Sequence, residues 1–274
     1  MRPRVPEGPR FLRSDGTPDK MTRVHKEQKW INETKEPEVL HSPNAPLRSV
    51  VIELLQSNLL NVIVAEGDKY LGVGTLPKVT ALIALWRDRN TPIYKIFLEP
   101  LKRLEERVPP ITDEMNDKDV SKLLDENALI DEYPVVSNEK VVAILPVREI
   151  IGKYSPSAPS VQLSSIAQEV PKVGSVGEAL LVMEEKGVPV VLVEDKVLDA
   201  RSVLKKIWDE RRKSIGEVSF DDVATENFNL FKASLTLKEI LEEIDPHKVD
   251  YILVDDDGKV KYVPLGRVAS KLLH

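Results

Sequence analysis

The pattern of apolar and polar residues changes its period within the last part of the chain, residues 251–273, and predicts a compound element there. Residues 251–254 are apolar and partly β-branched, an Asp-Asp-Asp-Gly turn follows at 255–258, and apolar residues alternate again over 260–263. This order is typical of a tight β-hairpin. From Leu265 onward apolar residues recur at spacings of three and four, which predicts an amphipathic helix. The unit is therefore strand, acidic turn, strand and helix.

The same order of features occurs three more times along the chain. Patterns of strand, turn, strand and helix occupy residues 61–85, 134–154 and 190–208. A helix-like segment precedes each of the four blocks, at residues 47–60, 117–130, 175–187 and 235–245. Recurrence at this length is the signature of a repeat architecture, so we expect four copies of one structural module.

The repeats fall into two halves. Proline and serine concentrate at residues 155–160, which predicts a linker and the main domain boundary. The first domain, 34–154, then holds repeats at about 38–89 and 108–154, and the second, 161–274, holds repeats at about 161–208 and 217–274. Residues 1–33 contain four prolines, two glycines and few apolar residues, which predicts an extended arm.

Charge distinguishes the arm from the rest of the chain. Residues 1–33 carry eight Lys and Arg against five Asp and Glu, whereas the whole chain has a formal net charge of −6. A basic arm is thus joined to an acidic body. The absence of cysteine excludes disulfides, thiol catalysis and thiolate metal sites. No apolar run is long enough to span a bilayer, which predicts a cytoplasmic protein with no membrane partner, and the 31% of charged residues favours a heat-adapted source.

The fourfold pattern resembles the CBS domain, the accessory module of cystathionine β-synthase. The resemblance covers residues 38–273 and includes the short matches LGVGTL at 71–76 and SVGEALLVMEEKGVPVVLV at 175–193. It implies an α+β fold of four CBS modules, each with two helices on a small three-stranded sheet, paired into two Bateman units. Members of the family commonly bind adenine nucleotides or S-adenosyl compounds between paired modules, so an adenine nucleotide is the candidate ligand, although no cofactor is required.

The resemblance also implies where such a ligand would bind. In the family, a Ser or Thr hydroxyl at the corner between strand and helix meets phosphate, and an Asp three residues later accepts from the ribose hydroxyls. No copy in this chain keeps both groups, because the corresponding pairs are Thr75 with Lys78, Pro146 with Glu149, Ser202 with Lys205, and Pro264 with Arg267. The weak candidate ligand-binding residues are therefore Thr75, Lys78, Glu149, Ser202, Lys205 and Arg267. They indicate either an altered site for a polyanionic ligand or ordinary helix caps.

The arm suggests a different partner. Arginines separated by proline and glycine form a thin cation that can neutralise phosphates, and aromatic residues beside them can stack on bases. The predicted RNA-binding residues are Arg2, Arg4, Arg10, Phe11, Arg13, Lys20, Arg23, Lys26, Lys29 and Trp30. The alternative is a solubilising tail. Basic groups at 86–89 and 205–213 could add RNA contacts, although their interleaved acids also fit a solvated helix face.

Two functions follow, and neither is catalytic. No nucleophile has an activating base nearby in the sequence pattern, no histidines have metal-ligand spacing, and no catalytic residues are proposed. The first function is a binding protein that docks on an RNA-containing assembly, above all the ribosome, and silences it with the arm; some CBS-domain proteins that resemble this plan act as ribosome hibernation factors. The alternative is a sensor of adenine nucleotides or S-adenosyl compounds that regulates an enzyme or transporter. The oligomeric state is not predicted.

Overall fold

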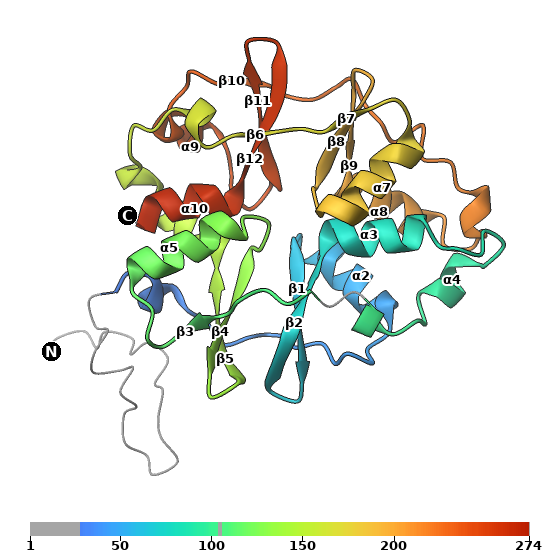
Figure 1. Ribbon diagram of the computed structural model, residues 1–274, viewed down its shortest axis with the longest axis horizontal. Helices are drawn as coiled ribbons and strands as arrows, with labels where there is room; N and C mark the ends of the chain where they lie inside the picture. The colour runs from blue at the N-terminus through green and yellow to red at the C-terminus, as the bar shows by residue number, and fades with distance from the viewer. Residues whose placement is uncertain (1–27, 104–105, 274) are drawn as a thin grey trace, which may run out of the picture.

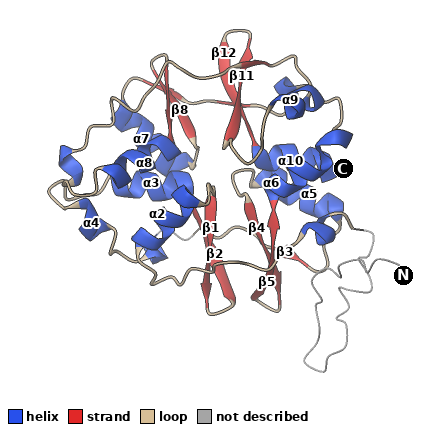
Figure 2. Ribbon diagram, turned by 180° about the vertical axis from the view of Figure 1, so that it is seen from behind, coloured by secondary structure: helices blue, strands red, loops and turns tan. Residues whose placement is uncertain are grey.

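The fold consists of four similar modules arranged around a common centre (Figure 1). The computed structural model describes residues 28–103 and 106–273. Among these residues no helix combines the length and the apolar character needed to cross a bilayer. Figure 2 shows that the β-hairpins extend away from the middle of the molecule, whereas the helices gather in two groups on either side of it.

The first half of the chain forms modules 1 and 2. Module 1 contains α2 (Leu47–Gln56), β1 (Asn61–Glu66), β2 (Lys69–Thr75) and α3 (Leu76–Ala84), and is followed by α4 (Ile93–Ile96) and η2 (Leu101–Arg103). Module 2 contains β3 (Ile111–Thr112), α5 (Asp117–Glu126), β4 (Glu132–Ser137), β5 (Lys140–Pro146) and α6 (Val147–Tyr154).

The second half forms modules 3 and 4 in the same order of elements. Module 3 contains β7 (Lys172–Val173), α7 (Val176–Lys186), β8 (Val190–Val193), β9 (Lys196–Asp199) and α8 (Ala200–Asp209), with η5 (Ile215–Glu217) after it. Module 4 contains β10 (Phe231–Lys232), α9 (Leu237–Glu243), β11 (Tyr251–Asp256), β12 (Lys259–Pro264) and α10 (Leu265–Leu273). Between the halves lie η3 (Ser155–Ser157), η4 (Leu163–Ser165) and β6 (Gln168–Glu169).

The hairpin predicted at residues 251–264 is confirmed. Strands β11 and β12 pair antiparallel from Tyr251 opposite Pro264 to Asp256 opposite Lys259. Asp257 and Gly258 both have positive φ, 53° and 82°, as a two-residue hairpin turn requires. The Asp255 carboxylate accepts the Gly258 amide at 2.8 Å and closes the turn.

The sheets differ between the two halves. Strands of modules 1 and 2 form one sheet in the order β1-β2-β5-β4-β3, joined where Lys69 pairs with Lys140. Module 3 keeps the expected three-stranded sheet, β7-β8-β9. In module 4 the order is β10-β11-β12-β6, because β6, which precedes module 3 in the chain, adds to the edge of β12.

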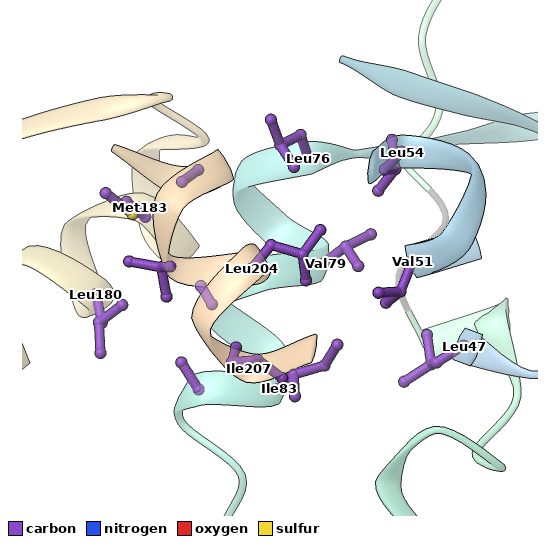
Figure 3. Packing of buried hydrophobic residues seen from close by; sticks show 14 of the residues in the cluster. Leu47, Val51, Leu54, Leu76, Val79, Ile83, Leu180, Met183, Leu204 and Ile207 are labelled. Carbon is purple, nitrogen blue, oxygen red and sulfur yellow. The ribbon is translucent and has the colours of Figure 1, made fainter. Parts of the chain in front are cut away.

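The hydrophobic cores join modules from opposite halves of the chain. One core combines modules 1 and 3, where α3 packs against α7 and α8 (Figure 3). The other combines modules 2 and 4, where α10 packs against α5 and α6. Buried hydroxyls make matching contacts: Thr80 donates to the Ala200 carbonyl at 3.2 Å, and Ser121 to the Ser270 carbonyl at 2.9 Å. The halves therefore stabilise each other, and the predicted linker at 155–160 connects parts of a continuous structure.

The segment before module 1 belongs to the folded body from residue 28 onward. Trp30, in η1 (Trp30–Glu33), is 0% exposed within the core of modules 2 and 4. Its indole nitrogen donates to the Met115 carbonyl at 3.3 Å, and Asp117 accepts the backbone amides of Lys29 and Trp30. The prediction that Trp30 stacks on RNA is therefore wrong, because an apolar ring at the edge of a charged segment is buried here as a core residue.

Candidate functional site

A cleft of about 360 Å³ lies where the four modules meet. Module 1 contributes Thr75, module 2 the segment 125–130, module 3 the segment 186–188, and module 4 Tyr262, Pro264 and Arg267. Glu106 and Gln168, from the connecting segments, complete the polar part of the lining. A ligand here would contact every module at once.

Thr75 provides the most unusual polar group in this cleft. It ends β2 and stands at the N-cap position of α3, yet its hydroxyl makes no capping hydrogen bond. The residue is 6% exposed, and its Oγ1 has no hydrogen-bond partner among the described residues. Leaving a buried hydroxyl unpaired costs about 1 to 3 kcal/mol, so this hydroxyl is a candidate donor to a ligand.

The start of α3 offers few backbone donors to an anion. The Leu76 amide already donates to the Leu60 carbonyl at 2.7 Å, and Pro77 has no N–H. An anion beside Thr75 would therefore depend on the threonine hydroxyl and on cationic side chains around it, with the helix dipole as a smaller contribution.

Lys78 and Glu106 form an ion pair at the edge of the cleft. Lys78 lies one turn into α3, and its Nζ is 2.6 Å from Glu106 Oε1. The segment carrying Glu106 reaches this place because Gly72 in β2 has no side chain: a Cβ there would lie 2.6 Å from the Glu106 carbonyl oxygen. That carbonyl accepts the amide of Val73 at 3.0 Å, which fixes the segment against β2.

Arg267 provides the cation from module 4. Its Nε lies 3.0 Å from Asp125 Oδ1, and its Nη1 donates to the Ile166 carbonyl at 3.2 Å. The Gln168 amide is 2.8 Å from the Tyr262 hydroxyl, and burial raises the pKa of Tyr262 to about 12 although Arg267 opposes the shift. Tyr262 is therefore a neutral hydroxyl at physiological pH.

Lys186 is the cation that the protein leaves available. It is exposed at the end of α7 and has no ion pair among the described residues. Gly187, with φ of 64°, ends that helix, and the Lys78 side chain packs against it. The lining also includes the carboxylates of Glu106, Asp125 and Glu126, of which Glu106 pairs with Lys78 and Asp125 with Arg267. Its apolar part includes Val108, Leu129 and Val188.

The other two strand-to-helix corners are closed by charged side chains instead. Arg148, at the second position of α6, is 7% exposed. Its Nε donates to Asp131 at 3.0 Å, one Nη to the carbonyls of Pro246 and Val249, and the other Nη to Asp250 at 3.1 Å. This guanidinium therefore makes four hydrogen bonds within the protein.

Arg201 occupies the corresponding second position of α8. It donates to both carboxylate oxygens of Asp250 and to the carbonyls of Leu54 and Leu59 in module 1. Asp131 also accepts the Leu60 amide at 3.0 Å. Burial raises the pKa of Asp131, and its bonds from Arg148 and Leu60 oppose that shift. The network joins all four modules.

Comparisons with known proteins address the fold. No family model and no curated protein match the chain. Among solved structures, protein MJ1225 from Methanocaldococcus jannaschii, described as a proposed archaeal homologue of g-AMPK, matches with a TM-score of 0.70 and 13% identity over 87% of this chain and 98% of its own. A conserved protein from Pyrococcus horikoshii matches with a TM-score of 0.51 and 15% identity over 87% and 97%. The chain has the CBS-domain fold.

The CBS modules bring together only some of the predicted ligand-binding residues. Thr75 and Arg267 both line the central cleft, and Lys78 reaches its edge through Glu106. Glu149 lies elsewhere, in an ion pair with Lys35. Tyr262, Gln168 and Glu106 were missed, because only folding brings these separate stretches of sequence to one place.

The third module shows an error of register in the prediction. Ser202 and Lys205 were assigned to the corner, but α8 begins at Ala200 and is capped by Asp199, whose carboxylate accepts the Ser202 amide at 2.9 Å. Ser202 therefore lies within the first helical turn, and neither it nor Lys205 lines the central cleft. The capping aspartate was the signal that identifies the true corner.

The predicted RNA-binding residues lie mainly beyond the described part of the chain. Arg2, Arg4, Arg10, Phe11, Arg13, Lys20, Arg23 and Lys26 are outside the described residues. Lys29 is half-buried, with its Nζ 5.7 Å from the centre of the Tyr154 ring. Within residues 28–103 and 106–273, no group of three or more His, Asp or Glu is placed to hold a metal ion.

Proposed function

We propose that this protein is a non-enzymatic regulator whose central cleft binds a small phosphorylated ligand, with an adenine nucleotide as the first candidate. The observation that carries the proposal is the buried hydroxyl of Thr75, which has no hydrogen-bond partner among the described residues and lies in a cleft lined by all four modules. A phosphate oxygen is the acceptor that this hydroxyl lacks, and the family places a hydroxyl of this kind against phosphate.

One charge in the cleft supports an anionic ligand. Lys186 lines the cleft and has no ion pair among the described residues, whereas Lys78 and Arg267 would exchange the carboxylates of Glu106 and Asp125 for phosphate. Charge-assisted hydrogen bonds to phosphate are about twice as strong as neutral ones. Lys78 and Arg267 stand where a ribose-binding acid would be expected, so the ligand would be held more through its phosphates than through its ribose.

The position of the cleft supports a regulatory role. A ligand that contacts modules from both halves of the chain stabilises the arrangement of the halves that it fits, relative to other arrangements. Because α3 and α10 each start at this cleft and pack across to the opposite half, binding there would bias how the halves are held together.

Ligand-induced stabilisation tests the proposal. Full-length protein would be unfolded by heat with ATP, AMP and S-adenosylmethionine; a ligand at about one hundred times its Kd stabilises by roughly 2.7 kcal/mol. We expect the effect to shrink in Thr75→Val and to persist in Ser202→Ala, a matched variant away from the cleft. Absence of stabilisation by all three ligands would contradict the proposal for them, and loss in Ser202→Ala alone would place the ligand elsewhere.

Docking on the ribosome through the basic arm stays a second candidate function, supported by the charge of the arm. Its test is co-sedimentation with ribosomal particles at low and high salt, because phosphate contacts weaken steeply as salt rises. The truncation should end at residue 27, since removing Trp30 would open the core. Equal sedimentation of the full chain and the truncated chain would exclude the arm as the binding element.

A further inference from the structure

Two segments that are distant in sequence form one surface at the outer side of modules 1 and 3. The Ile93 amide donates to the Lys213 carbonyl at 3.0 Å, and the Ile215 amide to the Thr91 carbonyl at 3.1 Å. Figure 1 shows α4 in this region, next to the chain that follows α8. The basic groups predicted separately at 86–89 and 205–213 thus belong to neighbouring segments.

The centre of this surface is apolar. Tyr94 and Leu98 are 53% and 68% exposed, which makes them the two most exposed large hydrophobic residues in the part of the chain that the structure describes. Tyr94 lies in α4 and Leu98 in the turn directly after it, where the Leu98 amide donates to the Lys95 carbonyl at 3.0 Å. Exposed apolar side chains on one short segment are typical of a contact site.

Cations surround that centre. The Arg211 guanidinium lies 4.7 Å from the Trp208 ring, and Trp208 stacks on Phe97 with ring centroids 5.6 Å apart. This stack places Arg211 near the segment that contains Phe97 and Leu98. Lys95 and Arg212 are exposed and have no ion pair among the described residues. Cations beside an exposed apolar centre favour an acidic partner.

We propose that the α4–α8 surface, defined as Tyr94, Lys95, Leu98, Arg211 and Arg212, docks an acidic amphipathic segment of a protein partner. An aliphatic and aromatic centre with a charged rim is the composition of protein interfaces, in which Tyr and Arg supply much of the binding energy. The exposed apolar side chains of Tyr94 and Leu98 favour a peptide over the continuous phosphates of RNA, because a peptide can supply an apolar face together with carboxylates.

The surface also spans two modules, which gives it a place in regulation. Tyr94 and Leu98 follow module 1, whereas Arg211 and Arg212 follow module 3. A partner bound there would sense the packing of these modules. The docking proposal itself does not depend on a ligand in the central cleft.

The test measures binding of a defined acidic peptide to full-length protein by fluorescence anisotropy. The probe is a labelled peptide of about five helical turns with Leu on one face and Glu elsewhere. The reference probes are a scrambled peptide of the same composition and an oligouridylate of the same formal charge. The surface variants are Leu98→Glu and Arg212→Glu, and the matched variants elsewhere are Leu181→Glu on α7 and Lys238→Glu on α9, both at exposed positions.

We expect the patterned peptide to bind, and each surface variant to weaken it about tenfold or more, while the matched variants change binding less than about twofold. The proposal is overturned if the patterned peptide binds no better than the scrambled one, or if the matched variants weaken it equally. It is also overturned if the oligouridylate binds more tightly and loses binding in the same two variants, because the surface would then be a nucleic-acid site.

Discussion

In each of the four modules a β-strand leads directly into a helix, but the residues at the start of these helices make two different kinds of contact. At modules 2 and 3 the second residue of the helix is an arginine, Arg148 or Arg201. Arg148 donates to Asp131 in its own module and to module 4, and Arg201 donates to modules 1 and 4. At modules 1 and 4 the second residue is Pro77 or Gly266. Neither residue has a long side chain that could fill the space between modules, and the central cleft lies beside both.

This difference shows how one repeated module can serve assembly at one junction and binding at another. Gly266 is required at its position because a Cβ would lie 2.6 Å from the Ala128 Cα, and its amide donates to the Ala128 carbonyl at 3.0 Å. Close approach of α10 to module 2 therefore forms one wall of the cleft. The arginine network, in contrast, ties all four modules through buried charge.

The largest expected effect on stability comes from removing Arg148, the arginine at the strand-to-helix corner of module 2. Arg148→Ala leaves Asp131 buried without its ion pair, which should cost about 3 to 5 kcal/mol of unfolding free energy. Arg267→Ala, at the corner of module 4 beside the cleft, should cost about 1 kcal/mol or less, because Arg267 and Asp125 are partly exposed. Urea denaturation of both variants measures the contrast. Equal losses would show that the two kinds of corner do not differ in energy.

Much of the fold was predictable because each module repeats a local pattern. Apolar alternation and an Asp-Gly turn define the hairpin of module 4, and the helix after it begins where the period changes at Leu265. The pairing of cores across the halves was not predictable from that pattern. It depends on which helix faces meet in space, and a helix such as α3 carries apolar residues on most of its surface.

The candidate site was predictable only in part. The resemblance predicted Thr75 and Arg267, which both line the cleft, because Thr75 ends the regular strand β2 and Arg267 lies in the first turn after the regular strand β12. It misplaced the corner of module 3, where Asp199 caps the helix and the strand is short. Trp30 was predicted to belong to the arm because its neighbours in the sequence are charged. The local sequence does not show that residues distant in the chain bury its ring.

A second prediction concerns the carboxyl group of Glu132, the residue next to the buried Asp131. Burial, with Asp131, Glu53 and Glu38 nearby, raises the pKa of Glu132 to about 8 from 4.5. The folded state then holds a proton that the unfolded state has lost, so this group lowers stability as pH rises from about 4.5 to about 8, and the effect is constant above that range. Glu132→Gln should be more stable than the natural protein at pH 8 by about 2 to 4 kcal/mol.

Denaturation of both proteins across that pH range measures the effect. The difference between Glu132→Gln and the natural protein should shrink toward zero as pH falls to about 4.5, because both side chains are then neutral. Glu139→Gln, at an exposed hairpin turn, provides the control and should show little pH-dependent change. A constant difference at every pH would mean that the carboxyl group does not titrate in this way.

A third prediction addresses the wall of the cleft. Gly266→Ala adds a Cβ against the Ala128 backbone, which must shift, and the expected cost is about 1 to 3 kcal/mol. Gly177→Ala in α7 is the matched control, since nothing lies within 4 Å of its Cβ position. It should stabilise the helix by about 0.5 to 1 kcal/mol. Opposite signs in thermal denaturation would confirm the close approach, whereas stabilisation by both variants would contradict it.

The smallest effect separates a binding hydroxyl from a structural one. Thr75→Val removes a buried hydroxyl that has no partner among the described residues, so the ligand-free protein should keep its stability or gain about 1 kcal/mol. Thr80→Val is the matched control, because its buried hydroxyl donates to the Ala200 carbonyl, and its loss should cost about 1 kcal/mol or more. Chemical denaturation without ligand compares the two. If Thr75→Val destabilises the protein as much as Thr80→Val, the Thr75 hydroxyl already has a structural role. The corner between β2 and α3 would then help to hold the modules together rather than bind a ligand.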